Sequence, residues 1–84
     1  MKLLIIEDFV ELAVKMKEAL EAIGVYVDVA NNGNSGEEKA FVNKYDAILL
    51  DLNLPDKDGI DILRFLREND IAVPIIIITA RDEL

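Results

Sequence analysis

Residues 3–8 read LLIIED, a run of four large aliphatic residues that ends in two acids. Similar runs are AILLD at residues 47–51 and IIIITA at residues 75–80, where threonine follows the aliphatic residues. Short Ile- and Leu-rich runs without polar alternation are typical of strands buried on both faces, as in parallel sheets. Ligands of open α/β sheets bind beyond the carboxyl ends of the strands. We therefore expect three acids and one hydroxyl to converge at one edge: Glu7, Asp8, Asp51 and Thr79.

Segments with helical periodicity separate these strands. Apolar residues recur at helical spacing over residues 9–23, where Asp8 is placed to cap the helix and Gly24 to end it. Residues 25–29 predict the second strand, and turn residues at 31–34 precede a weaker helix that runs to about residue 44 and contains Gly36. A third helix is expected from residue 60 to about residue 70, and a fourth strand from residue 73. We also expect Met16, Phe41 and Phe65 to lie in the core.

The alternation of strands and helices predicts an α/β fold with a parallel sheet. Because parallel crossovers are right-handed, we expect a doubly wound sheet of four strands in the order 2-1-3-4, with three helices. That order puts the fourth strand, an aliphatic run, at an open edge, which complete proteins normally cover.

Length, charge and composition exclude several classes of function. A chain of 84 residues forms one small domain at most, and a hydrophobic content of 52% is too high for a disordered chain. A net charge of -8 argues against binding to nucleic acid or to an anionic membrane. The chain has no cysteine or histidine, which excludes disulfides, thiolate metal sites and an imidazole base. With no signal peptide or spanning run in the sequence, we expect a cytosolic, cytoplasmic location.

Three motifs together resemble the receiver domain of two-component response regulators. They are IIED at residues 5–8, LLDLNLPDKDG at residues 49–59 and IITAR at residues 77–81. The resemblance runs over residues 1–84 without gaps. It implies a flavodoxin-like fold and a regulatory phosphoacceptor domain rather than an enzyme, with at most slow self-phosphorylation and dephosphorylation. A sensor histidine kinase is the implied phosphoryl donor.

The resemblance also implies the roles of the site residues. By the family pattern Asp51 is the phosphoacceptor, and Glu7 and Asp8 belong to the acidic group that holds Mg²⁺ or Mn²⁺. Asn53 occupies a position whose backbone carbonyl also binds the metal, and Thr79 is the switch hydroxyl. The family further carries a lysine at the end of a fifth strand, and the sequence ends before that position.

We therefore expect a single partial receiver domain over residues 1–84, truncated after the fourth strand. The fifth strand and the helices that flank it would be absent. We expect impaired phosphotransfer, because the lysine that neutralises phosphoryl charge is missing. We also expect a homodimer, formed through the exposed edge of the fourth strand or through the first helix.

The chemistry of the site leads to the same metal independently of the resemblance. A carboxylate that attacks a phosphoryl group meets charge repulsion, which a divalent cation relieves. Mg²⁺ prefers oxygen ligands and keeps several waters, so one or two carboxylates and a carbonyl suffice. Clustered carboxylates repel one another unless a cation lies among them.

Each motif has a simpler interpretation when it is taken alone. Glu7 and Asp8 would favour the positive start of a helix, Asp51 would begin a loop, and Thr79 would be a β-branched strand residue. The DKDG motif at residues 56–59 suggests a calcium loop, but its neighbours Pro55 and Ile60 break the ligand alternation that an EF-hand needs. A turn followed by a helix cap is the better interpretation there.

Two other classes of function stay open. One is a small flavodoxin-like cofactor-binding protein, although an acidic first loop disfavours a phosphate-bearing ligand. The other is a natural or engineered fragment that acts mainly as a self-assembling α/β structural module without phosphotransfer activity.

Overall fold

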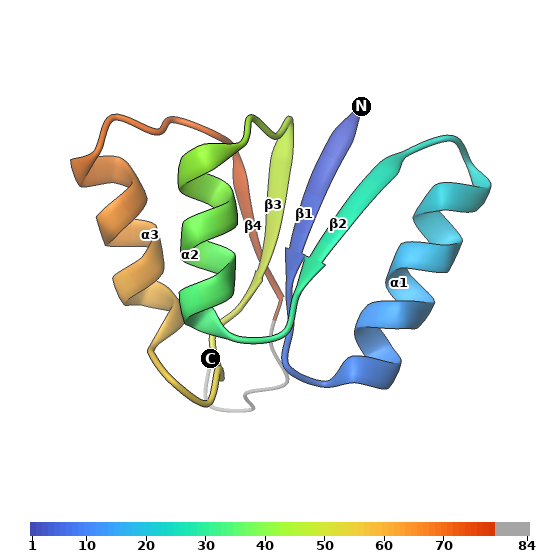
Figure 1. The fold of residues 1–84 in the computed structure, drawn as a ribbon, viewed down its shortest axis with the longest axis horizontal. Coiled ribbons are helices and arrows are strands. Elements are labelled where there is room, and N and C mark those ends of the chain that lie inside the picture. Colours follow the sequence, from blue (N-terminus) through green and yellow to red (C-terminus); the bar gives the residue numbers. More distant parts are fainter. Residues whose placement is uncertain (79–84) are drawn as a thin grey trace.

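Strands and helices alternate along the whole of the described chain (Figure 1). The computed structural model describes residues 1–78. Its elements are β1 (Lys2–Ile6), α1 (Val10–Ala22), β2 (Tyr26–Ala30), α2 (Gly33–Val42), β3 (Ala47–Asp51), α3 (Gly59–Glu68) and β4 (Ile75–Ile78). Among residues 1–78, none of these helices is both long enough and apolar enough to span a bilayer.

The sheet is parallel throughout, and its strand order is β2-β1-β3-β4. This order confirms the predicted 2-1-3-4 arrangement. Figure 1 shows α2 and α3 together on one side of the sheet and α1 on the other, as in a doubly wound fold. In register, Ile6 of β1 lies opposite Ala30 of β2 and Leu50 of β3. The carboxyl ends of the two central strands are therefore level with each other.

The main core lies between the sheet and the pair α2–α3. Alternate residues of a strand face the same side. On the side of this layer, the residues of β1 and β3 are completely or almost completely buried, and they form one cluster with two residues of α3: Leu4, Ile6, Ile48 and Leu50 from the strands, and Ile62 and Leu66 from the helix. Gly36 of α2 lies over Ile6, because a Cβ at Gly36 would come within 2.7 Å of the Ile6 side chain. The glycine that weakens the helical pattern thus allows α2 to approach the sheet closely.

The helix boundaries differ from the prediction at three points. Asp8 does not cap α1, because the N-cap position belongs to Phe9, which makes no side-chain cap hydrogen bond. The expected turn residues Gly33 and Asn34 instead form the first turn of α2, which Asn32 caps by accepting from Ser35 N at 2.8 Å. The same helix ends at Val42 rather than near residue 44.

Other local predictions are confirmed. Gly24 follows α1 with φ +90°, a left-handed conformation that suits glycine at a helix end. Asp58 caps α3 by accepting from Ile60 N at 2.9 Å, so the DKDG motif is a turn followed by a helix cap.

The prediction of three core residues is only partly met. Phe41 is not a core residue, because 55% of it is exposed and its ring packs against Phe65 at a centroid distance of 6.0 Å. Phe65 is half-buried and packs against the core cluster, whereas Met16 is half-buried outside that cluster.

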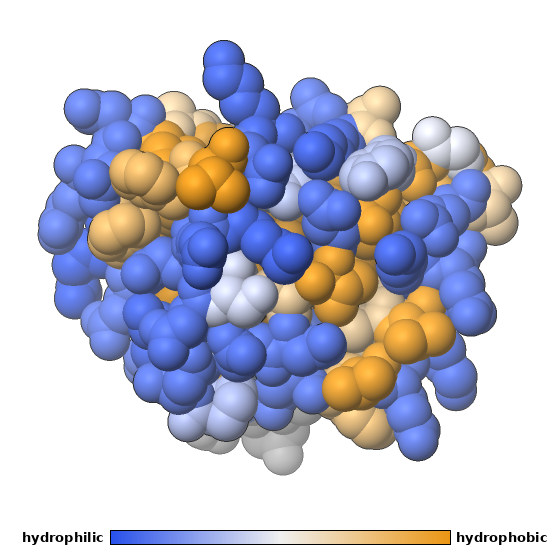
Figure 2. Space-filling view, in the orientation of Figure 1, coloured by the Kyte–Doolittle hydropathy of each residue, from blue (hydrophilic) through white to orange (hydrophobic). Residues whose placement is uncertain are grey.

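Large apolar side chains reach the surface at several places. Figure 2 shows a mainly hydrophilic surface interrupted by separate apolar patches. On β4, Ile76 and Ile77 are 54% and 39% exposed, and on the first turn of α1 and just before it, Phe9 and Leu12 are exposed. These two places are the strand edge and the helix that the sequence predicts as self-association surfaces.

Candidate functional site

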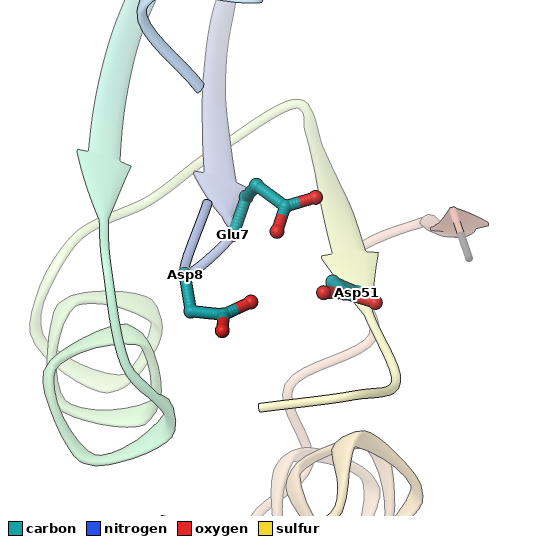
Figure 3. A group of neighbouring side chains, drawn as sticks. All are labelled: Glu7, Asp8 and Asp51. Atoms are coloured by element: carbon teal, nitrogen blue, oxygen red, sulfur yellow. The ribbon is translucent and has the colours of Figure 1, made fainter. Parts of the chain in front are cut away.

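Three carboxylates meet at the carboxyl edge of the sheet, as the sequence predicts. Glu7 and Asp8 follow β1, and Asp51 is the last residue of β3. One carboxylate oxygen from each lies within 4.8 Å of the others, and Figure 3 shows the three side chains grouped at the strand ends. Glu7 and Asp51 are 5% and 7% exposed, whereas Asp8 is exposed to solvent.

The backbone explains why these residues converge. Because Ile6 pairs with Leu50, the residues that follow them, Glu7 and Asp51, emerge side by side. Glu7 is fixed further by its N–H, which donates to Ala30 O at 3.0 Å. The chain then turns sharply, so that Glu7 Oε2 accepts from Phe9 N at 3.1 Å.

The site carries unbalanced negative charge. The pKa of Glu7 is raised from 4.5 to about 7, mainly by burial. The neighbouring Asp51 and Asp8 also raise this pKa, whereas the bond from Phe9 N lowers it. None of the ion pairs among residues 1–78 includes Glu7, Asp8 or Asp51. The carboxylates therefore repel one another without a cationic side chain to offset the repulsion.

Asn53, the fourth residue of the expected metal site, begins the loop after β3. Its N–H donates to Asp51 Oδ1 at 3.1 Å, and the residue forms an isolated antiparallel bridge with Asp58. Asn53 also lines the pocket of about 560 Å³ that contains the three carboxylates. Thr79, the expected hydroxyl of the site, lies outside the described residues.

The sequence interpretation missed part of the pocket wall. Phe9, Leu12, Met16 and Ile78 form the apolar lining beside the acids. The spacing of the first three marks one face of a helix, but periodicity alone does not show that this face borders a site. The pocket is thus lined by acidic side chains and, beside them, by apolar ones.

Two polar residues that the sequence predicts only as turn residues make long-range hydrogen bonds. Asn31 Nδ2 donates to Glu7 O at 3.0 Å. Asp56 Oδ1 accepts from Gly33 N at 2.6 Å. Both bonds join segments more than twenty residues apart, so neither follows from local turn propensity.

Chemically, the arrangement matches a hard divalent cation. Carboxylate oxygens at this spacing, two of the three groups being buried, are the ligands that Mg²⁺ and similar ions prefer. A cation bound there would favour the charged form of Glu7, whose pKa is raised by burial and, to a lesser degree, by the neighbouring acids. Asp51 also presents a carboxylate to the pocket, where it is placed to act as a nucleophile.

Known proteins with similar sequences and folds place these features in a family context. A family model described as the response regulator receiver domain matches residues 3–84. The transcriptional regulatory protein QseB of Escherichia coli O157:H7 is 43% identical over 84 residues, a match that covers 100% of this chain and 38% of that protein. The chain therefore spans well under half the length of the curated relatives it matches.

Solved structures agree in fold. The receiver domain of the Francisella response regulator 1452 superposes with a TM-score of 0.91 at 34% identity, covering 96% of this chain and 67% of that chain. The response regulator TrrA from Thermotoga maritima, solved in complex with Mg²⁺-BeF, gives a TM-score of 0.90 at 28% identity, covering 98% of this chain and 71% of that chain.

Proposed function

This chain belongs to the response regulator receiver domain family, and on that premise we propose that Asp51 accepts a phosphoryl group from a sensor histidine kinase in a Mg²⁺-dependent reaction. Receiver domains of response regulators are regulatory domains, and sensor histidine kinases phosphorylate them. The observation that carries the proposal is the position of Asp51, at the end of β3 and beside two further carboxylates in one pocket.

In the proposed step, a carboxylate oxygen of Asp51 attacks the phosphorus of a phosphohistidine. A P–O bond forms to Asp51, the P–N bond breaks, and the imidazole nitrogen leaves with the electron pair and takes up a proton. Asn53 N–H holds Asp51 Oδ1 at 3.1 Å and so restricts rotation of the carboxylate. The second oxygen, Oδ2, is the proposed nucleophile.

Glu7, Asp8, Asp51 and the backbone carbonyl of Asn53 are the groups that would hold Mg²⁺ or Mn²⁺. Such an ion neutralises phosphoryl oxygens as a carboxylate approaches them. Support comes from the three carboxylates within 4.8 Å and from the raised pKa of Glu7, which reflects burial and like charge that a cation would relieve. TrrA, with the same fold, was solved with Mg²⁺-BeF.

Thr79 is the proposed switch hydroxyl. It follows β4 directly in the sequence. Its hydroxyl would bond a phosphoryl oxygen once Asp51 is modified, and so draw its segment toward the site.

Labelling by a small phosphodonor tests the proposal. With acetyl phosphate and Mg²⁺, we expect slow labelling on Asp51 alone, which peptide mass spectrometry would locate and which a chelator would prevent. Asp51→Asn should remove the label. Asp46→Asn is the matched control, because Asp46 accepts from Lys2 N at the opposite edge of the sheet and should not affect labelling. Equal labelling of Asp51→Asn and wild type would refute the assignment.

A second proposal is that this chain forms a homodimer. Among residues 1–78, β4 pairs only with β3, and it exposes Ile76 and Ile77. An exposed aliphatic edge strand favours pairing with another strand, and burying each large aliphatic side chain contributes about 1.5–3 kcal/mol. The first turn of α1, with Leu12 exposed, is the alternative contact.

Sedimentation at low micromolar concentration tests the dimer. Ile77→Lys should shift the distribution toward monomer, whereas Val42→Lys, a control at an exposed apolar residue on α2, should not. A single monomeric wild-type species would refute the dimer. Dimers that show no acetyl phosphate labelling would favour the alternative function, a self-assembling structural module.

A further inference from the structure

The loop between β3 and α3 reaches across the molecule to the first turn of α2. Asp56 Oδ1 accepts from Gly33 N at 2.6 Å, and Oδ2 accepts from Asn34 N at 2.8 Å. The first amides of a helix have no acceptor within the helix. Since Ser35 N is already bonded by the cap residue Asn32, Asp56 supplies acceptors for the two amides that remain in this turn.

A second contact strengthens the same junction. Lys57 Nζ lies 3.3 Å from Glu37 Oε1, and both side chains are about three-quarters buried. The stem of Lys57 passes over Gly33, where an added Cβ would collide with Lys57 Cγ. The tip of the loop is therefore packed against α2 as well as hydrogen-bonded to it.

The other end of the loop lies in the acidic site. Asn53 bridges to Asp58, and Gly59 N donates to Leu52 O at 3.3 Å, which closes the loop at its base. A Cβ at Gly59 would lie 2.8 Å from Asp51 O, so the start of α3 packs directly on the end of β3. The base of the loop is therefore held at the acidic site, while its tip is held on α2.

The start of α2 is also tied to the β1 side of the site. Asn31, just before the helix cap, donates from Nδ2 to Glu7 O at 3.0 Å. The segment that leads into α2 therefore contacts the strand end that carries Glu7 and Asp8, while the first turn of α2 holds the loop that carries Asn53.

We propose that Asp56 is a positioning residue for the cation site, because it clamps the β3–α3 loop to α2 and so fixes Asn53 and Asp51 relative to Glu7 and Asp8. This inference rests on the proposed function, since it concerns binding at the same site. Asn32 already caps α2, and the carboxylate of Asp56 joins the β3–α3 loop to the first turn of α2, which a helix cap alone would not require.

The charge state of Asp56 suits this role. Hydrogen bonds from the backbone N–H groups of Asn34 and Gly33 lower the pKa of Asp56 below its ordinary value of 3.8. The group is therefore a carboxylate at neutral pH, at the positive end of the α2 dipole.

Calorimetric titration with Mg²⁺ provides the test. Asp56→Ala removes both hydrogen bonds and should weaken Mg²⁺ binding about tenfold, the lower end of the losses caused by outer-shell changes at metal sites. Asp56→Asn keeps one acceptor oxygen and should lose less. Glu68→Gln, at an exposed position at the far end of α3, removes the same charge and should bind as wild type does.

Hydrogen exchange provides a second test, because its response to Mg²⁺ would not change if Asp56 served only to stabilise the fold. Coupling between two sites is reciprocal. Mg²⁺ should therefore slow exchange of the Gly33 and Asn34 amides in the wild type, and this slowing should disappear in Asp56→Ala. Far-UV circular dichroism verifies that each variant is folded. If Asp56→Ala does not fold, Asp56→Asn is used for the same comparison.

The outcomes separate the two proposals. If the wild type binds Mg²⁺ and folded Asp56→Ala binds it equally well, the positioning role of Asp56 is refuted, and the proposed function is unaffected. Equal losses in Asp56→Ala, Asp56→Asn and Glu68→Gln would attribute the effect to net charge and would also overturn the clamp. No Mg²⁺ binding by the wild type would refute the proposed cation site first, and the clamp with it.

Discussion

At the amino edge of the sheet, opposite charges are paired, whereas at the carboxyl edge like charges are gathered. Lys2 Nζ lies 4.0 Å from Asp28 Oδ2, and Tyr45 OH donates to the same oxygen at 2.7 Å. The backbone N–H of Lys2 donates to Asp46 Oδ2 at 2.7 Å. At the other edge, three carboxylates face one pocket, and none of them takes part in an ion pair among residues 1–78.

The two edges differ in whether their charges are balanced within the fold. The amino edge satisfies its polar groups internally, so its contacts add to stability with no further partner. The carboxyl edge buries Glu7 beside Asp51, which costs stability that the proposed cation would restore. Functional sites commonly retain such costs.

The largest expected effect is the pH dependence that Glu7 introduces. Burial raises the pKa of Glu7 from 4.5 to about 7, so between these values the folded state holds a proton that the unfolded state has lost. Raising the pH through this window therefore lowers stability, at about 1.4 kcal/mol per pKa unit and by at most about 3 kcal/mol. Urea unfolding in a chelator, at pH 5 and pH 8, measures this loss.

Glu7→Gln removes the titrating group and should abolish the fall in stability between the two pH values. The variant should also be more stable than wild type at pH 8 without metal, and should bind Mg²⁺ more weakly. Parallel pH profiles for wild type and Glu7→Gln would show that the carboxyl edge carries no such cost.

At the amino edge, Tyr45→Phe should lower stability without affecting the site. The change removes a hydrogen bond to the carboxylate of Asp28, which is worth about 1–2 kcal/mol. Chemical unfolding at neutral pH measures the loss, and Mg²⁺ affinity should equal that of wild type. An altered Mg²⁺ affinity would mean that the two edges are not independent.

The same tyrosine should make the stability of the protein depend on pH in the alkaline range. Burial and the neighbouring Asp28 raise the pKa of Tyr45 above its ordinary value of 10.0. The folded state thus keeps a proton that the unfolded state loses, so stability is complete below pH 10 and falls above it. Unfolding midpoints from pH 8 to pH 11 should fall more steeply for wild type than for Tyr45→Phe, and identical slopes would contradict this.

The smallest effect is expected for Lys2→Gln. The ion pair with Asp28 is partly exposed, and the ammonium also lies 5.4 Å and 5.2 Å from the ring centroids of Tyr26 and Tyr45. Exposed pairs and cation–π contacts of this kind contribute about 0.5–1 kcal/mol, and salt screens the ionic part. Unfolding at low and high salt should show that the loss of stability in Lys2→Gln becomes smaller as salt is added. A loss that does not depend on salt would show that the ion pair contributes nothing.

The strands and the convergence of the acids could be predicted from the sequence because both follow from local patterns, whereas the strand order is expected from the general rule for crossovers in a doubly wound sheet. Each aliphatic run marks a buried strand, and the residue after it lies at the carboxyl edge. The hydrogen bonds of Asn31 and Asp56 could not be predicted, since each joins residues more than twenty positions apart. The sequence predicts Asp8 as a helix cap because a cap residue and a site residue have the same chemistry, and only the tertiary structure places Phe9 at the cap.

The central claim is that the carboxyl edge, unlike the amino edge, is built to hold a cation. Mg²⁺ calorimetry on two matched variants, Asp8→Asn and Asp28→Asn, tests it most directly. Asp8→Asn removes a carboxylate of the acidic site, whereas Asp28→Asn removes the carboxylate that contacts Lys2 and Tyr45. We predict that wild type binds one Mg²⁺, that Asp8→Asn binds at least about tenfold more weakly, and that Asp28→Asn binds as wild type does although it is less stable. Equal affinities in all three proteins, or equal losses in the two variants, would contradict the claim.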